Sequence, residues 1–195
     1  LCRLAGIRLI HVSTDCVFDG QKGEYEETDP PCPGDLYGRS KLLGEIGDKP
    51  VLTIRTSIIG HELSSQHGLI EWFLSQKRSV NGFVNHIFSG FPTIVIANLI
   101  ISHVLGQTDL YGIYHLSSQP ISKYELLRMV AKEYHHPVEV VPDYTSQCNR
   151  SLKCDRLKQA IGFETPPWEI MIRQMYEDYR ISGYENITGK DGRGL

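Results

Sequence analysis

Apolar and polar positions in the first sixty residues predict two buried strands with a helix between them. Residues 8–13 (Arg-Leu-Ile-His-Val-Ser) and 51–55 (Val-Leu-Thr-Ile-Arg) are mostly apolar runs, as in the central strands of a parallel sheet. Between these runs, Asp35 can cap a helix that continues to about Ile46, where Gly47 stops it. A helix that connects two apolar strands predicts a right-handed parallel crossover.

The rest of the chain continues this alternation less regularly. Residues 19–35 are rich in Gly, Pro, Asp and Glu and predict a long surface loop of the kind that is usually functional. The later expected elements are helices over 69–76 and 94–105 (the second one buried), a strand over 112–116, a helix with a capping box at Ser122 and Glu125, a strand over 138–141, and helices starting near Ser151 and Thr165. The pattern indicates an α/β layer followed by a smaller mixed α/β part.

Composition excludes several classes of protein. The chain has 195 residues, of which 41% are hydrophobic, so it can bury a sizeable core. Its formal charge of -3 gives no basic surface for nucleic acid, and its longest apolar run, 94–101, is too short to span a membrane. We therefore expect neither a nucleic-acid nor a membrane partner.

The cysteines and histidines do not indicate a metal or a disulfide framework. Five cysteines are an odd number, and none forms a Cys-x-x-Cys pair. Of the eight histidines, His61 and His67 have no carboxylate or cysteine at ligand spacing beyond Glu62, and His11, His135 and His136 have structural explanations, so no metal is expected. The chain begins at Leu1 without a signal peptide and enters an apolar run at once, which suggests a cytoplasmic protein whose N-terminal part is missing here.

The candidate chemistry begins with Tyr37 and Lys41. On a helix these two residues lie four apart and share a face. A nearby ammonium group favours the phenolate form of a phenol, which eases proton transfer to and from a carbonyl oxygen near neutral pH. Alone the pair is weak, because about half an occurrence is expected by chance from this composition. Thr14 adds weight, because it follows the first strand, where ligands of parallel sheets bind.

The combined motifs resemble the dTDP-4-dehydrorhamnose reductases of the extended short-chain dehydrogenase/reductase superfamily. The resemblance covers about residues 7–170. It rests on the stretches Ser13-Thr14-Asp15-Cys16-Val17-Phe18-Asp19-Gly20, Tyr37-Gly38-Arg39-Ser40-Lys41-Leu42-Leu43-Gly44-Glu45, Arg55-Thr56-Ser57, Gly90-Phe91-Pro92-Thr93 and Gly112-Ile113-Tyr114-His115-Leu116-Ser117 followed by Ser122.

The resemblance implies a fold and a division of the chain. It implies the C-terminal portion of a Rossmann-like NAD(P)-binding domain over residues 1–60. A mainly substrate-binding part is expected over 61–182, with some segments returning to the Rossmann sheet, and a flexible tail over 183–195. The glycine-rich turn that binds the dinucleotide pyrophosphate in this family is absent from the 195 residues, so we expect the chain alone to bind cofactor weakly and to be inactive.

The resemblance also implies roles for named residues. Tyr37 would protonate the C4 oxygen of a keto sugar as hydride arrives at C4, and Lys41 would bind the nicotinamide ribose and tune Tyr37. Thr14 would hydrogen-bond the reacting carbonyl, and Asp15 would orient the sugar. The remaining assignments are Ser13, Thr56 and Ser57 near the cofactor, Ile58 at the substrate, and the loop around 90–93 closing the substrate side.

Three changes, at four positions, depart from the family pattern, and all concern substrate recognition. Cys16 stands where the family usually has Tyr, and Ile58 where an aromatic residue often contacts the sugar. Ile87 and Phe88 replace polar residues ahead of the Gly-x-Pro-Thr loop. The identity of the sugar is therefore left open, whereas the residues for carbonyl reduction are intact.

The implied function is NADPH-dependent reduction of a nucleotide-linked 4-keto-6-deoxysugar, as in dTDP-rhamnose and polysaccharide biosynthesis. NADH remains an alternative cofactor, and a homodimer is one possible assembly. Two other functions stay open. One is a non-catalytic regulatory subunit like that of methionine adenosyltransferase, and the other is a nucleotide-sugar epimerase or dehydratase, which would retain its NAD.

Overall fold

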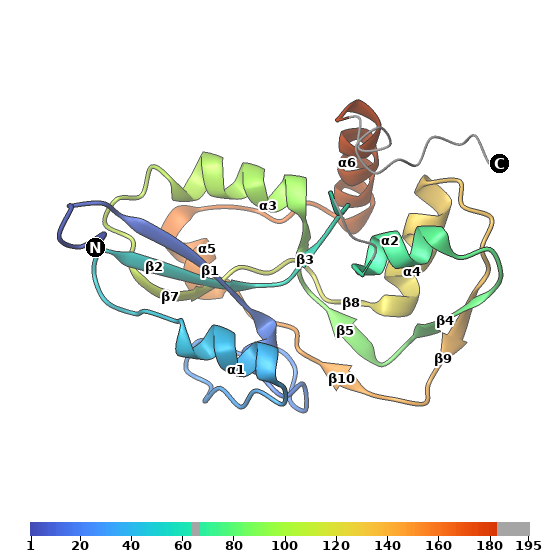
Figure 1. Ribbon diagram of the computed structural model, residues 1–195, viewed down its shortest axis with the longest axis horizontal. Helices are drawn as coiled ribbons and strands as arrows, with labels where there is room; N and C mark the ends of the chain where they lie inside the picture. The colour runs from blue at the N-terminus through green and yellow to red at the C-terminus, as the bar shows by residue number, and fades with distance from the viewer. Residues whose placement is uncertain (64–66, 183–195) are drawn as a thin grey trace.

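The central feature is a three-stranded parallel sheet. The computed structural model describes residues 1–63 and 67–182 and is shown in Figure 1. The sheet has the order β1 (Leu9–Thr14), β2 (Val51–Thr56) and β7 (Gly112–His115). Since Thr14 pairs with Thr56 and Arg55 with His115, all three strands end at the same edge of the sheet. The predicted parallel pair and the α/β fold are confirmed.

Helices cover both faces of this sheet. Figure 1 shows α1 (Leu36–Leu43) on one face and α3 (Thr93–Leu99) on the other. All six residues of β2 are buried, including the polar side chains Thr53, Arg55 and Thr56, as expected for a central strand covered on both faces. The long helix predicted over 94–105 corresponds to α3 followed by a π-helical turn, Ile100–Val104. The prediction that this helix is buried throughout is wrong. Ile101 is 62% exposed, because only one face of this helix meets the core.

A second region packs helices against short strands. Its helices are α2 (Leu69–Ser75), α4 (Lys123–Glu133) and α6 (Trp168–Ile181). Short strands pair as β3–β6, β4–β9 and β10–β5–β8. The bounds of the remaining elements are η1 Asp15–Val17, β3 Ile58–Ile59, β4 Val80–Phe83, β5 His86–Phe88, β6 Phe91–Pro92, β8 Ile121–Ser122, β9 Val140–Asp143, β10 Cys148–Asn149 and α5 Asp155–Ile161.

One apolar core joins the two regions. It contains Ile54 of β2, Phe73 of α2, Leu126 of α4 and Met171 of α6, all fully buried. Strand β7 returns from the second region to the central sheet (Figure 1). The proposed division at residue 60 therefore crosses a shared core and stays a prediction, and the tail over 183–195 lies outside the described residues.

Several predicted boundaries were wrong for local reasons. The helix expected to reach Ile46 ends at Leu43, with Gly44 as its C-cap. No helix starts at Ser151, because its carbonyl accepts the Tyr25 N–H at 2.8 Å; α5 starts at Asp155 instead. The strand expected over 138–141 is shifted to Val140–Asp143.

One boundary signal was read correctly. The capping box at Ser122 and Glu125 is present and starts α4.

Among the helices of the described residues, none combines the length and apolar character that crossing a membrane requires.

Candidate active site

The end of β1 carries the first group of predicted site residues. Thr14 is buried and caps the short η1 turn, because its Oγ1 accepts the Cys16 N–H at 3.2 Å. The same hydroxyl donates to Asp15 Oδ1 at 3.2 Å. Ser13, expected near the cofactor, instead donates its hydroxyl to Glu45 at 2.7 Å. The Thr14 hydroxyl thus lies at the edge of the sheet, as the motif predicted.

Helix α1 brings the second group to the same edge. Asp35 caps the helix by accepting the Gly38 N–H at 2.7 Å, as predicted. A Cβ at Gly38 would overlap the carbonyl oxygen of Cys16, so glycine lets the helix lie directly on η1. Lys41 donates from Nζ to the Val12 carbonyl oxygen at 2.6 Å, which ties α1 to β1.

Tyr37 lies one turn before Lys41 on this helix. Tyr37 is 56% exposed, and its hydroxyl has no hydrogen-bond partner among the described residues. Helix α1, which carries Tyr37 and Lys41, packs against β1 and η1, and Lys41 bonds Val12, two residues before Thr14. This arrangement leaves the phenol open to solvent, where a bound molecule can reach it.

The end of β2 carries Thr56 and Ser57. Thr56 is 2% exposed and, within the described part of the chain, its buried Oγ1 has no partner. Ser57 is half-buried, and its side chain acts to lower the pKa of Asp15. The two neighbours therefore differ, because Ser57 faces the pocket described next whereas Thr56 is sealed in the sheet.

A pocket of about 220 Å³ begins where β1 and β2 end. Of the predicted site residues, Asp15, Ser57 and Ile58 line it, as does Cys16, whereas Thr14, Tyr37 and Lys41 do not. The remaining lining residues come from later in the chain and are Ile59, Leu69, His86, Ile87, Phe88, Lys123, Cys148 and Arg150. The positions where this sequence departs from the family pattern, Cys16, Ile58, Ile87 and Phe88, all line this pocket.

The loop predicted to close the substrate side has a different place. Residues Phe91–Pro92 form β6, which pairs with β3, and Thr93 begins α3. A Cβ at Gly90 would overlap the Ser57 carbonyl oxygen, so glycine is required for this close approach. None of residues 90–93 lines the pocket, and β6 instead pairs with β3.

Arg150, Lys123 and His86 are pocket residues that the sequence did not reveal. They come from the segment after β10, the first turn of α4 and β5. Arg150 donates to Cys16 Sγ at 3.4 Å, and its Nε is buried without a partner in the described residues. Burial and then Lys123 lower the pKa of His86. A single Arg in a polar loop has no spacing that marks it, so pattern analysis could not find this residue.

Burial governs the protonation of the two side chains after Thr14. Burial raises the pKa of Asp15 above its usual value, although hydrogen bonds from Thr14 and the charge of Arg150 oppose the change. Burial and then the Asp15 carboxylate raise the pKa of Cys16. Cys16 is therefore a thiol at neutral pH and serves as a small wall of the pocket rather than as a nucleophile.

A buried polar network holds the sheet edge in place. Arg55 of β2 pairs with Glu45, and its Nη1 lies 3.4 Å from His115 Nε2 on β7. His115 Nδ1 lies 3.0 Å from the Tyr25 carbonyl oxygen, which anchors the long loop over 19–35.

Within the described residues, no group of three or more His, Cys, Asp or Glu side chains is arranged to hold a metal ion.

The fold and the pocket define a Rossmann-like α/β protein with a pocket at the carboxyl ends of parallel strands, where such folds commonly bind ligands. A profile of the family described as RmlD substrate binding domain matches residues 1–181. The chain belongs to this family, which confirms the resemblance found in the sequence.

Relatives in this family have different activities. A dTDP-4-dehydrorhamnose reductase of Aggregatibacter actinomycetemcomitans is 28% identical over 193 residues, 86% of this chain and 65% of that protein. Methionine adenosyltransferase 2 subunit beta of Danio rerio is 28% identical over 194 residues, 86% of this chain and 59% of that protein. The chain therefore spans less than two thirds of the length of either relative.

A solved structure shows the same fold. It is a dTDP-4-dehydrorhamnose reductase of Bacillus anthracis in complex with NADP, with a TM-score of 0.75 and 24% identity. The match covers 91% of this chain and 67% of that one.

Proposed function

We propose that this chain forms the substrate-binding and proton-donating part of a reductase that uses NADPH to reduce the C4 ketone of a nucleotide-linked deoxysugar. The observation that carries the proposal is the contact between α1 and the end of β1, where Lys41 donates to Val12 at 2.6 Å beside Thr14. Tyr37 stands exposed on the same helix, and the pocket opens next to Thr14. The relatives named as reductases support the same chemistry.

Proton transfer is the role of Tyr37. When bound, NADPH supplies the hydride that adds to C4, and the ketone oxygen then needs a proton. The exposed phenol of Tyr37 donates that proton to the sugar O4, giving an alcohol and NADP⁺. Lys41 has three N–H donors and uses one on Val12, so it keeps donors for the ribose of the cofactor and for Tyr37.

Thr14 and Asp15 hold the reacting sugar. The Thr14 hydroxyl oxygen already accepts the Cys16 N–H, so its own proton can turn from Asp15 to the ketone oxygen without loss of the turn. Asp15 faces the same pocket and can accept from a sugar hydroxyl. This positioning supplies much of the rate that an enzyme needs.

Arg150 and Lys123 bind the anionic part of the substrate. A pocket of about 220 Å³ is smaller than the usual ligand pocket of roughly 300–1,000 Å³, so it accommodates only part of a nucleotide sugar. The two cations of its wall match a phosphate group, because Arg binds two phosphate oxygens at once. We assign Ile58 to the apolar face of the sugar, as the family resemblance implies.

The residues near the cofactor fit it unequally. Lys41 and Tyr37 are accessible at the sheet edge and fit the nicotinamide ribose. Ser57 is half-buried beside Asp15, whereas the Thr56 hydroxyl is sealed and Ser13 is committed to Glu45. We therefore assign direct contact to Ser57 and a supporting role to Thr56 and Ser13. NADH remains the alternative to NADPH, and a cytoplasmic location, the rhamnose pathway and a homodimer stay predictions.

A regulatory subunit is the second candidate function. It is favoured by the equal identity, 28%, of this chain to methionine adenosyltransferase 2 subunit beta. Such a protein would bind a partner enzyme without reducing a sugar. An epimerase or dehydratase is distinguished differently, because it would retain NAD through purification.

The experiment that separates these functions is a reductase assay. The full-length protein is mixed with NADPH and dTDP-4-dehydrorhamnose, and NADPH absorbance is followed. The proposal predicts loss of absorbance that requires both compounds, with free exchange of the cofactor. Absence of turnover in a protein that still binds NADPH would reject the reductase, and co-purification with a second enzyme would then support the regulatory subunit.

A further inference from the structure

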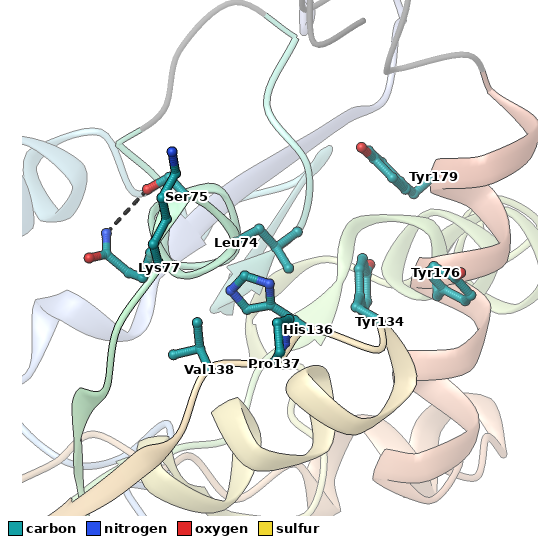
Figure 2. Close-up of a pocket in the computed structure, with 10 residues that line it drawn as sticks. Leu74, Ser75, Lys77, Tyr134, His136, Pro137, Val138, Tyr176 and Tyr179 are labelled. Atoms are coloured by element: carbon teal, nitrogen blue, oxygen red, sulfur yellow. Dashed lines mark hydrogen bonds between the residues drawn. The ribbon is translucent and has the colours of Figure 1, made fainter. Parts of the chain in front are cut away.

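A second and larger pocket lies at the ends of α2, α4 and α6 (Figure 2). Its volume is about 690 Å³, and it shares no lining residue with the pocket that contains Asp15 and Arg150. This volume is in the usual range for small-molecule sites. The reductase chemistry proposed above makes no use of it.

One wall of this pocket consists of tyrosines. The ring of Tyr134 lies 4.7 Å from that of Tyr176 and 6.1 Å from that of Tyr179, centroid to centroid. Tyr134 ends a buried chain of hydrogen bonds, because its hydroxyl lies 2.8 Å from His61 Nε2. His61 Nδ1 in turn lies 2.6 Å from Glu71 Oε1, and both side chains are only 3% exposed.

This chain of hydrogen bonds has a direction. A carboxylate only accepts, so His61 donates from Nδ1 to Glu71, and when the ring is neutral its Nε2 accepts the Tyr134 hydroxyl proton. In that state the Tyr134 proton points toward His61, and the lone pairs of its oxygen remain available as acceptors. Burial, and then Tyr179 and Glu71, raise the pKa of Tyr134, which stays a phenol.

The other side of the pocket carries a cation. Figure 2 shows Lys77 on the side away from Tyr176 and Tyr179. Lys77 is exposed and forms no ion pair with any described residue, and among those residues no carboxylate lines the pocket. Leu74, Val138 and His136 lie between the two sides, and the buried Nε2 of His136 has no hydrogen-bond partner among the described residues. The pocket thus presents acceptors and aromatic rings at one end and an ammonium group at the other.

We propose that this pocket binds a small zwitterion of the α-amino-acid type. The ligand ammonium group donates to the Tyr134 oxygen and lies near the tyrosine rings, which attract cations. Its carboxylate pairs with Lys77, and an apolar side chain contacts Leu74 and Val138. The proposal is independent of the reductase function.

The test uses three related probes with the full-length protein. L-Phenylalanine carries both charges, phenethylamine lacks the carboxylate, and 3-phenylpropionate lacks the ammonium group. Their dissociation constants are measured from chemical-shift changes in NMR spectra. Tyr134→Phe and Lys77→Gln are compared with Tyr144→Phe and Lys132→Gln, which change exposed residues outside the pocket.

The two variants should affect different probes. Tyr134→Phe should weaken the binding of L-phenylalanine and phenethylamine about tenfold and leave the binding of 3-phenylpropionate unchanged. Lys77→Gln should weaken the binding of L-phenylalanine and 3-phenylpropionate about threefold, as expected for an exposed ion pair. If Tyr134→Phe fails to fold, the Lys77→Gln variant still tests whether the carboxylate of the ligand pairs with Lys77. Failure of phenylalanine to bind at millimolar concentration, or equal losses in the control variants, would overturn the proposal.

Discussion

Glu45 and Arg55 form a two-point ion pair inside the molecule. Arg55 Nε lies 2.9 Å from Glu45 Oε1, and Nη2 lies 2.7 Å from Oε2. The side chains are 4% and 3% exposed, and Glu45 also accepts the Ser13 hydroxyl. One carboxylate therefore connects the segment after α1 to both β1 and β2, and it fixes the helix that carries Tyr37 and Lys41.

Removing one partner of this pair should destabilise the protein strongly. Arg55→Met leaves the Glu45 carboxylate buried without its cation, so we expect a loss of about 3–5 kcal/mol in the free energy of unfolding. Urea denaturation of the 195-residue chain measures it. The matched control is Lys153→Gln, which breaks an exposed pair with Glu26 and should have a much smaller effect. Equal effects of the two changes would show that Glu45 is not held as described.

Gly38→Ala should separate α1 from the end of β1. The added Cβ would overlap the Cys16 carbonyl oxygen, and the resulting shift should cost about 1–3 kcal/mol in unfolding free energy. Gly34→Ala is the control, because a Cβ there meets no atom within 4 Å. Thermal denaturation compares the two. Unchanged stability of the Gly38 variant would mean that the helix does not lie against η1.

His115 should make stability depend on pH. Burial lowers the pKa of His115 in the folded protein below its ordinary value of 6.5. The unfolded chain therefore binds a proton before the folded protein does, so stability is complete above about pH 7 and is lost as the pH falls through about 6.5, by at most about 1.4 kcal/mol per pH unit. Urea midpoints at several pH values measure this. His115→Gln should flatten the profile, whereas His135→Gln, an exposed change, should leave it unchanged.

Arg150→Met should weaken substrate binding by the reductase. Loss of charge-assisted hydrogen bonds to a phosphate should raise KM for the nucleotide sugar about 10- to 100-fold, with a smaller change in kcat. Steady-state kinetics of the full-length protein measure both constants. Arg128→Met changes an exposed arginine outside the pocket and should leave them unchanged. An unaltered KM in the Arg150 variant would place the phosphate elsewhere.

The sequence predicted the elements that build the sheet edge because their signals are local. The apolar runs of β1 and β2, the Asp35 cap and the Ser122 capping box each lie within a few residues. The end of α1 was misjudged because tertiary contact decides it, since the chain must leave the helix for Glu45 to reach Arg55.

The second region was less predictable. Strands such as β3, β6 and β10 have only two residues each, too few to show a period. The pocket wall was missed for a related reason, because Arg150 and Lys123 meet Asp15 only through long-range packing. Ser151, which resembles a helix cap, instead bonds Tyr25 across the molecule. Local pattern therefore identified the candidate residues of β1 and α1 but not the residues that face them.

The central claim is that Tyr37 delivers the proton to the sugar oxygen while Lys41 holds the cofactor. The most direct measurement is the kcat of the full-length Tyr37→Phe variant with NADPH and dTDP-4-dehydrorhamnose, alongside its dissociation constant for NADPH. The account predicts that kcat falls about 10²- to 10⁴-fold while NADPH affinity changes little. A variant that keeps its kcat, or that loses turnover and cofactor affinity in equal measure, would contradict it.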